Sequence, residues 1–304
     1  MSKKYELGFT VSSLTDYTAE ATELLRAGIL FNDDMKNYSF QTGVKYIEPL
    51  NIISTEVVFQ STDCGLSQSG DTTFTEKDIT VAKYAVKKRF CVGDLENKNL
   101  PLAPGSSMDS LDNQIEVILT QQIQDNTKLQ VEQDLWLGTS TFIDGWFDML
   151  SACTGAISLD TYSATTVTSD NVDNVVDDFM DNVTDAMWSR GVLTIHCSVA
   201  TYNLYKRNRL TANYFHDKQD LGAMENWVFG YEGQVKIKGE AGLAGSNYMM
   251  LTWDKNLWIA VDEENELSYA KWIFDDVTDY LWYKQYFKLG QQIAFCGECI
   301  HNMY

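Results

Sequence analysis

The longest regular pattern of apolar and polar positions runs from Asp109 to Leu137, where no glycine or proline interrupts the chain. Apolar residues such as Ile115 and Ile123 recur at helical spacing, so this stretch predicts one helix. Glutamine and asparagine fill much of its middle, which leaves a narrow apolar stripe. Gly138 follows as a helix-ending residue. At about 1.5 Å per residue, the helix is about 40 Å long. We expect one side to lie on a sheet and the rest to face solvent or other subunits.

Two segments before this helix predict long strands. Residues 52–60 and 79–90 are rich in β-branched and aromatic side chains. The segment between them is small and polar, with Gly65 and Gly70 as turn formers. The pattern indicates a β-hairpin with a polar tip. An isolated two-stranded hairpin is marginally stable in water, so its apolar side needs a partner surface in the same chain or a neighbour.

The first 45 residues have too few apolar side chains for a core of their own. Residues 14–30 predict a short helix capped by Asp16, and the segment that follows is extended or irregular. The N-terminal segment is therefore interpreted as an arm that lies on another surface.

The second half of the chain mixes helices and strands without strict alternation. Residues 169–191 predict one amphipathic helix that begins at a Ser169 cap and stops at Gly191. Residues 192–210 predict a buried strand and then a helix that starts near Ser198. A short strand is expected near 156–168, and mostly strands after 228. This order favours the α+β class over a doubly wound sheet.

Composition and charge narrow the function. The chain has 304 residues, 44% of them hydrophobic, which is enough for a sizeable core. Its formal net charge is −20, from 43 acids and 23 bases, which disfavours direct binding to DNA or RNA phosphates. No apolar run approaches the roughly 20 residues of a membrane span, and no signal-peptide pattern is present. The six scattered cysteines are expected to be free thiols rather than a disulfide framework.

The search for a catalytic or metal site finds little. Cys296, Cys299 and His301 resemble half of a zinc site, but no second pair with metal spacing accompanies them, so free thiols are the expected state. His196 lies in an apolar run and is expected to be buried and structural, and His216 lies in a polar loop. No hydrolase, zinc-protease or phosphate-loop motif is present. We expect no catalytic residue, no metal and no cofactor.

Other charged and glycine-rich segments have ordinary explanations. Acidic runs such as Asp177–Asp178 lack the spacing of a calcium loop. The glycine-rich segment 239–247 has no lysine for phosphates and is expected to be a loop between strands. The basic cluster of the chain lies in the second strand of the hairpin. In a chain of this charge, it is expected to meet acids of a neighbouring subunit rather than DNA. Its members are Lys83, Lys87, Lys88 and Arg89.

The order of these elements resembles the major capsid proteins of tailed phages with the Hong Kong 97 fold. The resemblance covers nearly the whole chain by pattern rather than by an invariant motif. The segment TEKDITVAKYAVKKRFCVGDLENKNL is similar to the strand that leads from the family's extended loop, and EVILTQQIQDNTKLQVEQDLWLGTS with DGWFDMLSA resembles its spine helix and the turn after it. VLTIHCSVATYNLYKRNRL resembles the axial-domain strand and helix. VFGYEGQVKIKGEAGL, YMMLTWDKNLWIAVD and YLWYKQYFKLGQQIAF resemble the closing strands.

The resemblance implies a division of the chain into four parts. It implies an N-terminal arm over 1–45 and an extended β-hairpin, the E-loop, over 46–90. It implies a peripheral domain that holds the spine helix, about 109–137, and a mixed α/β axial domain. The peripheral domain would comprise 91–149 and 262–287, and the axial domain 150–261 and 288–304.

The function implied is structural rather than enzymatic. The chain would assemble with itself, as hexamers and pentamers, into an icosahedral head that encloses double-stranded phage DNA without binding it specifically. Portal, scaffold or decoration proteins are the further partners, with no membrane. The protein would reside in the virion, and in the host cytoplasm during assembly. The alternatives are an encapsulin-like compartment shell and, more remotely, a zinc-dependent enzyme.

Two family features receive separate expectations. Some members cross-link an E-loop lysine to an asparagine of a neighbour. The hairpin tip has no lysine, and Lys77 lies on the return strand, so that bond is not expected. Many members begin with a scaffolding segment, whereas this chain starts at Met1 close to the arm, so a scaffold is expected to be a separate protein.

Overall fold

The computed structural model of the chain describes two sheets and the helices packed on them. The described residues are 37–55, 72–91, 108–138, 144–159, 167–211, 226–262, 269–275, 278 and 280–303. The expected helix over 14–30, the end of the expected strand over 52–60 and most of the expected polar tip over 61–78 lie outside the described residues, as does His216.

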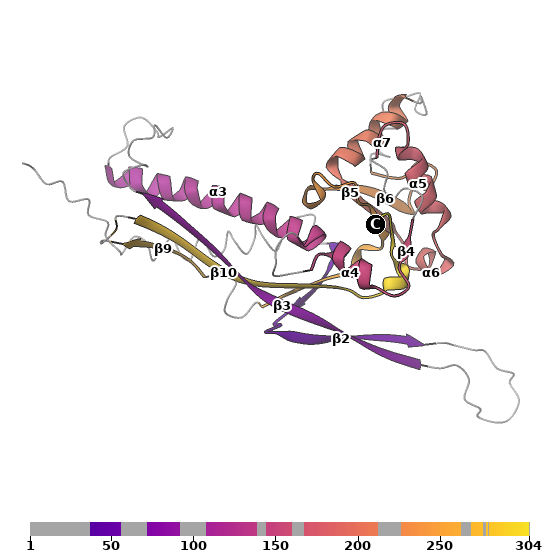
Figure 1. The fold of residues 1–304 in the computed structure, drawn as a ribbon, viewed down its shortest axis with the longest axis horizontal. Helices are drawn as coiled ribbons and strands as arrows, with labels where there is room; N and C mark the ends of the chain where they lie inside the picture. Colours follow the sequence, from indigo (N-terminus) through magenta and orange to yellow (C-terminus); the bar gives the residue numbers. More distant parts are fainter. Residues whose placement is uncertain are drawn as a thin grey trace, which may run out of the picture.

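A long twisted sheet forms one end of the molecule and continues into a projecting hairpin (Figure 1). Its strands run in the order β1-β8-β10-β3-β2, and β9 pairs with the other edge of β10. The sheet is mixed, because β1 runs parallel to β8 whereas the other pairs are antiparallel. Its strands are β1 Ser39–Thr42, β2 Ile47–Thr55, β3 Thr72–Cys91, β8 Leu257–Val261, β9 Tyr269–Asp275 and β10 Tyr280–Ile293.

The predicted hairpin is confirmed, but its first strand begins five residues earlier than expected and its second strand is longer than expected. β2 and β3 pair from Ile47↔Thr80 to Thr55↔Thr72, so part of the expected polar tip belongs to a strand. Pro49 can occupy β2 because this strand is an edge of the sheet, where no further ladder bond is needed. β3 then pairs along its second half with β10.

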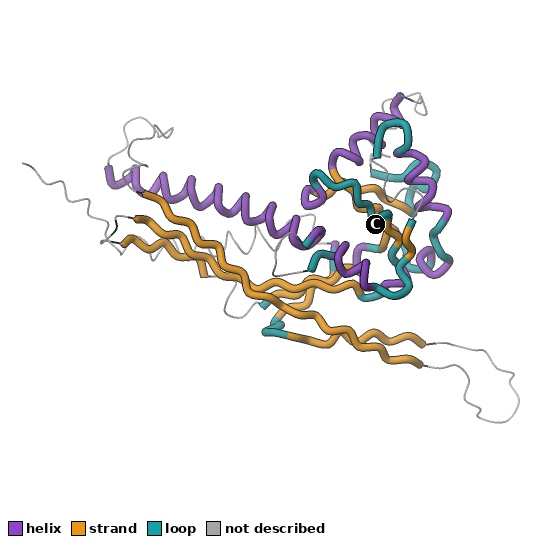
Figure 2. The backbone as a smooth tube through the Cα atoms, viewed as in Figure 1, coloured by secondary structure: helices purple, strands orange, loops and turns teal. Residues whose placement is uncertain are grey.

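The predicted long helix is α3, Met108–Leu137, and it lies along the sheet beside β9 and β10 (Figures 1 and 2). Gly138 ends it with a φ of 60°, and its N–H donates to the Asp134 carbonyl at 3.0 Å. The narrow apolar stripe buries Ile123 and Leu135 against the sheet. The helix therefore needs few apolar residues, because only one side of it is covered.

Part of the expected arm lies within the body of the same chain. β1 pairs with β8 from Ser39↔Trp258 to Thr42↔Val261. Tyr38, just before it, is 7% exposed and belongs to the main core. The residues before 37 lie outside the described residues.

A second, smaller sheet forms the compact end of the molecule, in the order β4-β11-β7-β5-β6. The predicted strand and helix of residues 192–210 are confirmed as β5 and α7, which follow one another directly. The elements of this end are α4 Trp146–Ala152, β4 Ile157–Ser158, α5 Val172–Asp181, α6 Asp185–Trp188, β5 Leu193–Ser198, α7 Val199–Thr211, β6 Val235–Glu240, η2 Ala241–Leu243, β7 Met250–Thr252, η3 Asp254–Asn256, η4 Cys296–Glu298 and β11 Ile300–His301.

Residues 169–191 were expected to form a single helix, and this prediction was wrong, because they form two helices, α5 and α6. α5 ends at Asp181, and Thr184 begins α6 by accepting a hydrogen bond from the Met187 N–H at 3.4 Å. Ser169 is not the cap either, because Asn171 occupies that position. The predicted apolar face is nevertheless buried, since it does not depend on the break. Its fully covered members are Val172, Val175, Val176, Phe179 and Met187.

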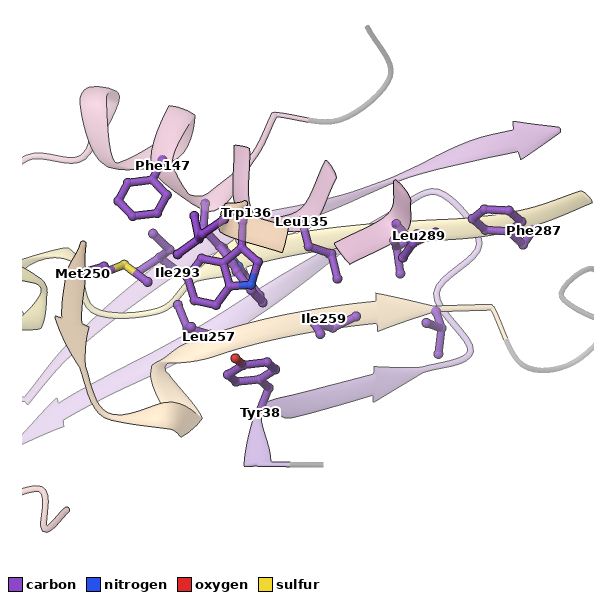
Figure 3. Close-up of a cluster of buried hydrophobic side chains, with 14 of the residues drawn as sticks. Tyr38, Leu135, Trp136, Phe147, Met250, Leu257, Ile259, Phe287, Leu289 and Ile293 are labelled. Atoms are coloured by element: carbon purple, nitrogen blue, oxygen red, sulfur yellow. The ribbon is translucent and has the colours of Figure 1, made fainter. Parts of the chain in front are cut away.

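The main core lies where the two ends meet (Figure 3). Trp136 of α3 and Phe147 of α4 pack there with Met250 of the small sheet and Ile293 of the long one. Large aromatic side chains bury much apolar area, so this cluster stabilises the junction as well as each sheet. A separate core, between α5, α7 and the small sheet, stabilises the compact end.

The sheets divide the chain differently from the expected domain boundaries. β8 was expected in the domain over 150–261, yet it pairs with β1 and with the last part of β10 in the long sheet. That last part of β10 was itself expected in the other range of that domain, 288–304. The chain passes between the sheets after α4, between β7 and β8, and between β10 and β11. No helix within the described part of the chain is long and apolar enough to cross a membrane.

Candidate functional site

The cysteines correct one expectation. Cys153, just after α4, forms a disulfide with Cys296 of η4, with Cα atoms 5.7 Å apart across 143 residues of sequence. The expectation of scattered free thiols is therefore wrong for this pair. The sequence could not reveal it, because neither cysteine lies in a motif with its partner.

The half zinc site is not assembled. The Cys296 sulfur belongs to the disulfide, and Cys299 is a buried thiol 3.2 Å from the Asn256 side-chain amide. Burial raises the pKa of Cys299 to about 12, which keeps it protonated. Among the residues that the structure describes, no group of three or more histidine, cysteine, aspartate or glutamate side chains is arranged to hold a metal ion.

His196 is buried, as expected, and it lies at the centre of a polar cluster between the two sheets. Its Nδ1 is 2.8 Å from Oε1 of Glu240, and its Nε2 is 3.5 Å from Asp254. The Lys238 ammonium lies 3.0 Å from the same Glu240 oxygen, and the Tyr38 hydroxyl donates to that oxygen at 3.1 Å. The cluster therefore combines two carboxylates with two basic groups, which offsets much of the cost of burying charge.

The surroundings shift the pKa values of this cluster. Burial alone would lower the pKa of His196, but its contacts with Asp254 and Glu240 outweigh burial and raise the pKa. Burial would raise the pKa of Glu240 and of Asp254, but His196 and Lys238 hold both below their usual range. The cluster is thus a set of ion pairs rather than a general base poised near neutrality.

A basic and aromatic face covers the side of the long sheet opposite α3. Lys87 and Arg89 of β3 lie directly opposite Lys284 and Trp282 of β10, so their side chains share a face. Lys271 of β9 continues the row next to Lys284. The Arg89 guanidinium lies 5.8 Å from the centre of the Trp282 ring, within the range of a cation–π contact. Exposed Lys83 lies on this same face by strand alternation, whereas Lys88 alternates to the other face.

Comparison with known proteins gives a result at the level of the fold. No family model and no curated protein matches the sequence. A chain of the satellite phage P4 procapsid structure matches with a TM-score of 0.59 and 10% identity, over 100% of this chain and 94% of that one. The capsid of a native GTA particle matches with a TM-score of 0.56 and 10% identity, over 99% and 93%. A virus-like particle from Pyrococcus furiosus matches with a TM-score of 0.52 and 10% identity, over 96% and 99%.

The chain has the fold of phage capsid proteins. In this capsid fold, the basic face and the polar cluster both combine residues far apart in sequence. Sequence analysis identified the β3 cations but missed Lys271 and Lys284, because strand pairing brings them together. The alternation of Tyr280, Trp282 and Lys284 was the available signal. Glu240 and Asp254 gave no signal, since isolated acids are ordinary in a chain with 43 of them.

The polar cluster of the capsid fold predicts a stability maximum in mildly acidic solution. A raised folded pKa makes His196 stabilising below its unfolded value, about 6.5, and this stabilisation is lost as pH rises through the folded pKa. The lowered pKa values of Glu240 and Asp254 stabilise above about pH 4, and this is lost as pH falls through their folded values. Guanidinium unfolding at a series of pH values should therefore give the largest free energy between about pH 4.5 and 6.5.

The matched variant is His196→Gln, which removes the titrating ring. We expect it to be less stable than the parent protein and to lose the decline on the alkaline side. An equal alkaline decline in both proteins would show that another group causes it.

Proposed function

We propose that this chain is the major capsid protein of a tailed phage, which assembles with itself into the icosahedral head around double-stranded DNA. The observation that carries the proposal is the fold match, which extends over the whole chain and 93–94% of shell subunits in two particles. Because the match covers 99–100% of this chain, it is not limited to one of the two sheets. The phage and GTA shells among the similar structures favour this function over an encapsulin-like compartment.

Each part of the proposed capsid subunit can be assigned to particular elements of this chain. The segment 1–45 would be the N-terminal arm, and β2 with β3 would form the E-loop. α3 would be the spine helix of a peripheral domain built on the long sheet. The small sheet with α5, α6 and α7 would be the axial domain. Strand pairing supports placing β8 in the peripheral domain rather than in the axial domain.

The hairpin presents surface that the single chain leaves uncovered. β2 and β3 project beyond the rest of the long sheet (Figure 1). Tyr46, just before β2, and Ile47, the first residue of β2, are 70% and 50% exposed. Exposed apolar side chains on an edge strand are a liability unless another surface covers them. In the proposed shell, an adjacent subunit would cover them.

The basic face supplies a second contact surface. The whole chain carries a net charge of −20, so cations gathered on one face leave the remaining surface more acidic. Complementary charge steers association and fixes the register of partners. We infer that this face contacts an acidic surface of a neighbouring copy in closed hexamers and pentamers.

The outer side of α3 fits the neighbourhood of packaged DNA. Gln121, Gln122, Asp125 and Asn126 are exposed on it. Neutral and acidic side chains offer no counter-charge to phosphates, so DNA beside them stays mobile. Portal, scaffold and decoration proteins remain proposed partners, with assembly in the host cytoplasm.

The basic face gives a direct test of assembly. We expect Lys87→Glu to raise the protein concentration needed for assembly about tenfold or more, because like charges then meet at every repeated contact. Light scattering against protein concentration measures this threshold. Lys255→Glu is the matched control, since Lys255 is exposed on η3 away from the basic face. Equal thresholds for the two variants would remove the basic face from the contact.

The proposed function itself is tested by expressing the full chain and viewing it by negative-stain microscopy. We expect closed hollow particles of uniform size. Particles recovered from infected cells should contain genome-length DNA, whereas an enzyme cargo would indicate the compartment alternative. Monomers with no particles would contradict both.

A further inference from the structure

The Cys153–Cys296 disulfide lies where the chain passes between the two sheets. Cys153 follows α4, which packs in the main core, and precedes β4 of the small sheet. Cys296 follows β10 of the long sheet and precedes β11 of the small one. The bond therefore joins two of the three crossings, with Cα atoms 5.7 Å apart.

The strands that follow the two disulfide-linked crossings, β4 and β11, pair with each other in the small sheet. The Ile157 N–H donates to the Cys299 carbonyl at 2.9 Å, and the Leu159 N–H donates to the His301 carbonyl at 2.8 Å. The third crossing joins them through Asn256, whose side-chain amide donates to the Phe295 carbonyl at 2.9 Å. A covalent bond at this point thus restrains how the two ends of the molecule move relative to each other.

The disulfide is open to small reagents. Both of its cysteines are only partly buried, and they line a cavity of about 880 Å³ with Lys77 of β3. By contrast, Cys197 and Cys299 are fully buried, and burial raises the pKa of each thiol. Thiol exchange needs an accessible sulfur and a thiolate, so the two buried cysteines are inert by comparison.

Lys77 favours exchange at Cys296. Its ammonium donates to the Cys296 sulfur at 3.0 Å and to the Ile293 carbonyl at 2.9 Å. A cation in contact with a sulfur stabilises the thiolate that forms when the disulfide opens. Cys296 is therefore the better leaving group of the pair, and its thiol also ionises more readily for attack when the bond forms again.

We propose that Cys153–Cys296 is a thiol–disulfide exchange site, assisted by Lys77, that locks and releases the junction between the two sheets. In reduction by a small dithiol, one reagent thiolate attacks Cys153, the S–S bond breaks, and Cys296 leaves as the thiolate beside Lys77. The second reagent thiol displaces Cys153 and closes the reagent into a cyclic disulfide. Two electrons and two protons thereby pass to the protein.

The reverse reaction uses a small disulfide such as oxidised glutathione. The Cys296 thiolate attacks it and releases one glutathione thiolate, and Cys153 then displaces the second to form the protein disulfide. The inference concerns the single chain and does not rest on the proposed shell function.

The first test equilibrates the purified full chain in buffers of different reduced-to-oxidised glutathione ratio. After alkylation, peptide mass spectrometry reports each cysteine. We expect Cys153 and Cys296 to convert reversibly and together, while Cys197 and Cys299 stay unlabelled in the folded protein. Alkylation of Cys153 and Cys296 even in the most oxidising buffer would overturn the exchange site, as would reduction only after unfolding.

The second test measures the role of Lys77. In Lys77→Met, loss of the cation raises the Cys296 thiol pKa, so a smaller fraction of the thiol is ionised, and this loss outweighs the gain in nucleophilicity of each thiolate. We expect re-formation of the disulfide to slow about threefold, and Lys77→Arg to retain the parent rate. Equal rates for the methionine and arginine variants would overturn the role of Lys77.

The third test addresses the lock itself. Hydrogen exchange should become faster at the Ile157 and Leu159 amides after reduction, and stay unchanged at Ile195 within β5. The same change should follow from Cys153→Ser with Cys296→Ser, and Cys91→Ser serves as the matched thiol control because Cys91 is unpaired in the structure. If hydrogen exchange at the Ile157 and Leu159 amides did not change, the disulfide would not restrain the junction, and the proposal would be overturned.

Discussion

Replacing Trp136 by alanine is expected to lower the free energy of unfolding by about 3–5 kcal/mol. Trp136 is 1% exposed and lies at the junction of both sheets (Figure 3). Its ring centre is 4.8 Å from that of Trp146 and 4.9 Å from that of His196. The side chains around Trp136 belong to separate elements, so they cannot move together to fill the cavity that the alanine substitution would leave.

The close approach of η2 limits relaxation further. A side chain on Gly242 would meet the backbone of Glu132 at 2.5 Å and the Trp136 ring at 2.7 Å, so η2 is already as near to α3 as glycine allows. Urea unfolding followed by circular dichroism measures the loss. Leu129→Ala is the matched control on the same helix, because Leu129 is 48% exposed. Similar losses for the two variants would contradict the assignment of Trp136 to the core of the junction.

The second large effect is expected for Glu240→Gln, which keeps the side-chain volume and removes the charge. Glu240 is 2% exposed and contacts His196 and Lys238. Loss of one partner leaves the other buried charges uncompensated, which typically costs about 3–5 kcal/mol. The measurement is chemical unfolding at about pH 6, where the unfolded pKa of histidine is still above the solution pH.

Glu232→Gln provides the control for this substitution. Glu232 is exposed and accepts a hydrogen bond from the Gly230 N–H, which glutamine can also accept. We expect a change within about 0.5 kcal/mol. If Glu240→Gln were equally mild, the ion pairs around His196 would not be important for the junction.

Local patterns in the sequence predicted individual elements well. The stripe on α3 and the glycine after it gave the helix and its end, and the run before Ser198 gave β5 and α7. These signals are local, because helix periodicity and end residues depend on neighbours within a few positions. The break between α5 and α6 was missed because the apolar spacing continues through it, while the Thr184 cap competes with the helix.

Contacts between residues far apart in the sequence could not be predicted from local patterns. β1 joins β8 across more than 200 residues, and the Cys153–Cys296 bond spans 143. The same is true of the basic face, where β10 and β9 bring Lys284 and Lys271 beside Lys87. Strand order and register place these residues, and neither follows from the alternation within one strand.

The most direct test of the shell proposal is the mass of the purified full chain by sedimentation velocity over a range of concentrations. A capsid subunit leaves the surfaces of its hairpin and its basic face for neighbours, so we expect closed particles of many copies, far heavier than the 34.5 kDa chain. A single species of 34.5 kDa that persists at high concentration, with the hairpin protected from proteolysis, would contradict the proposal.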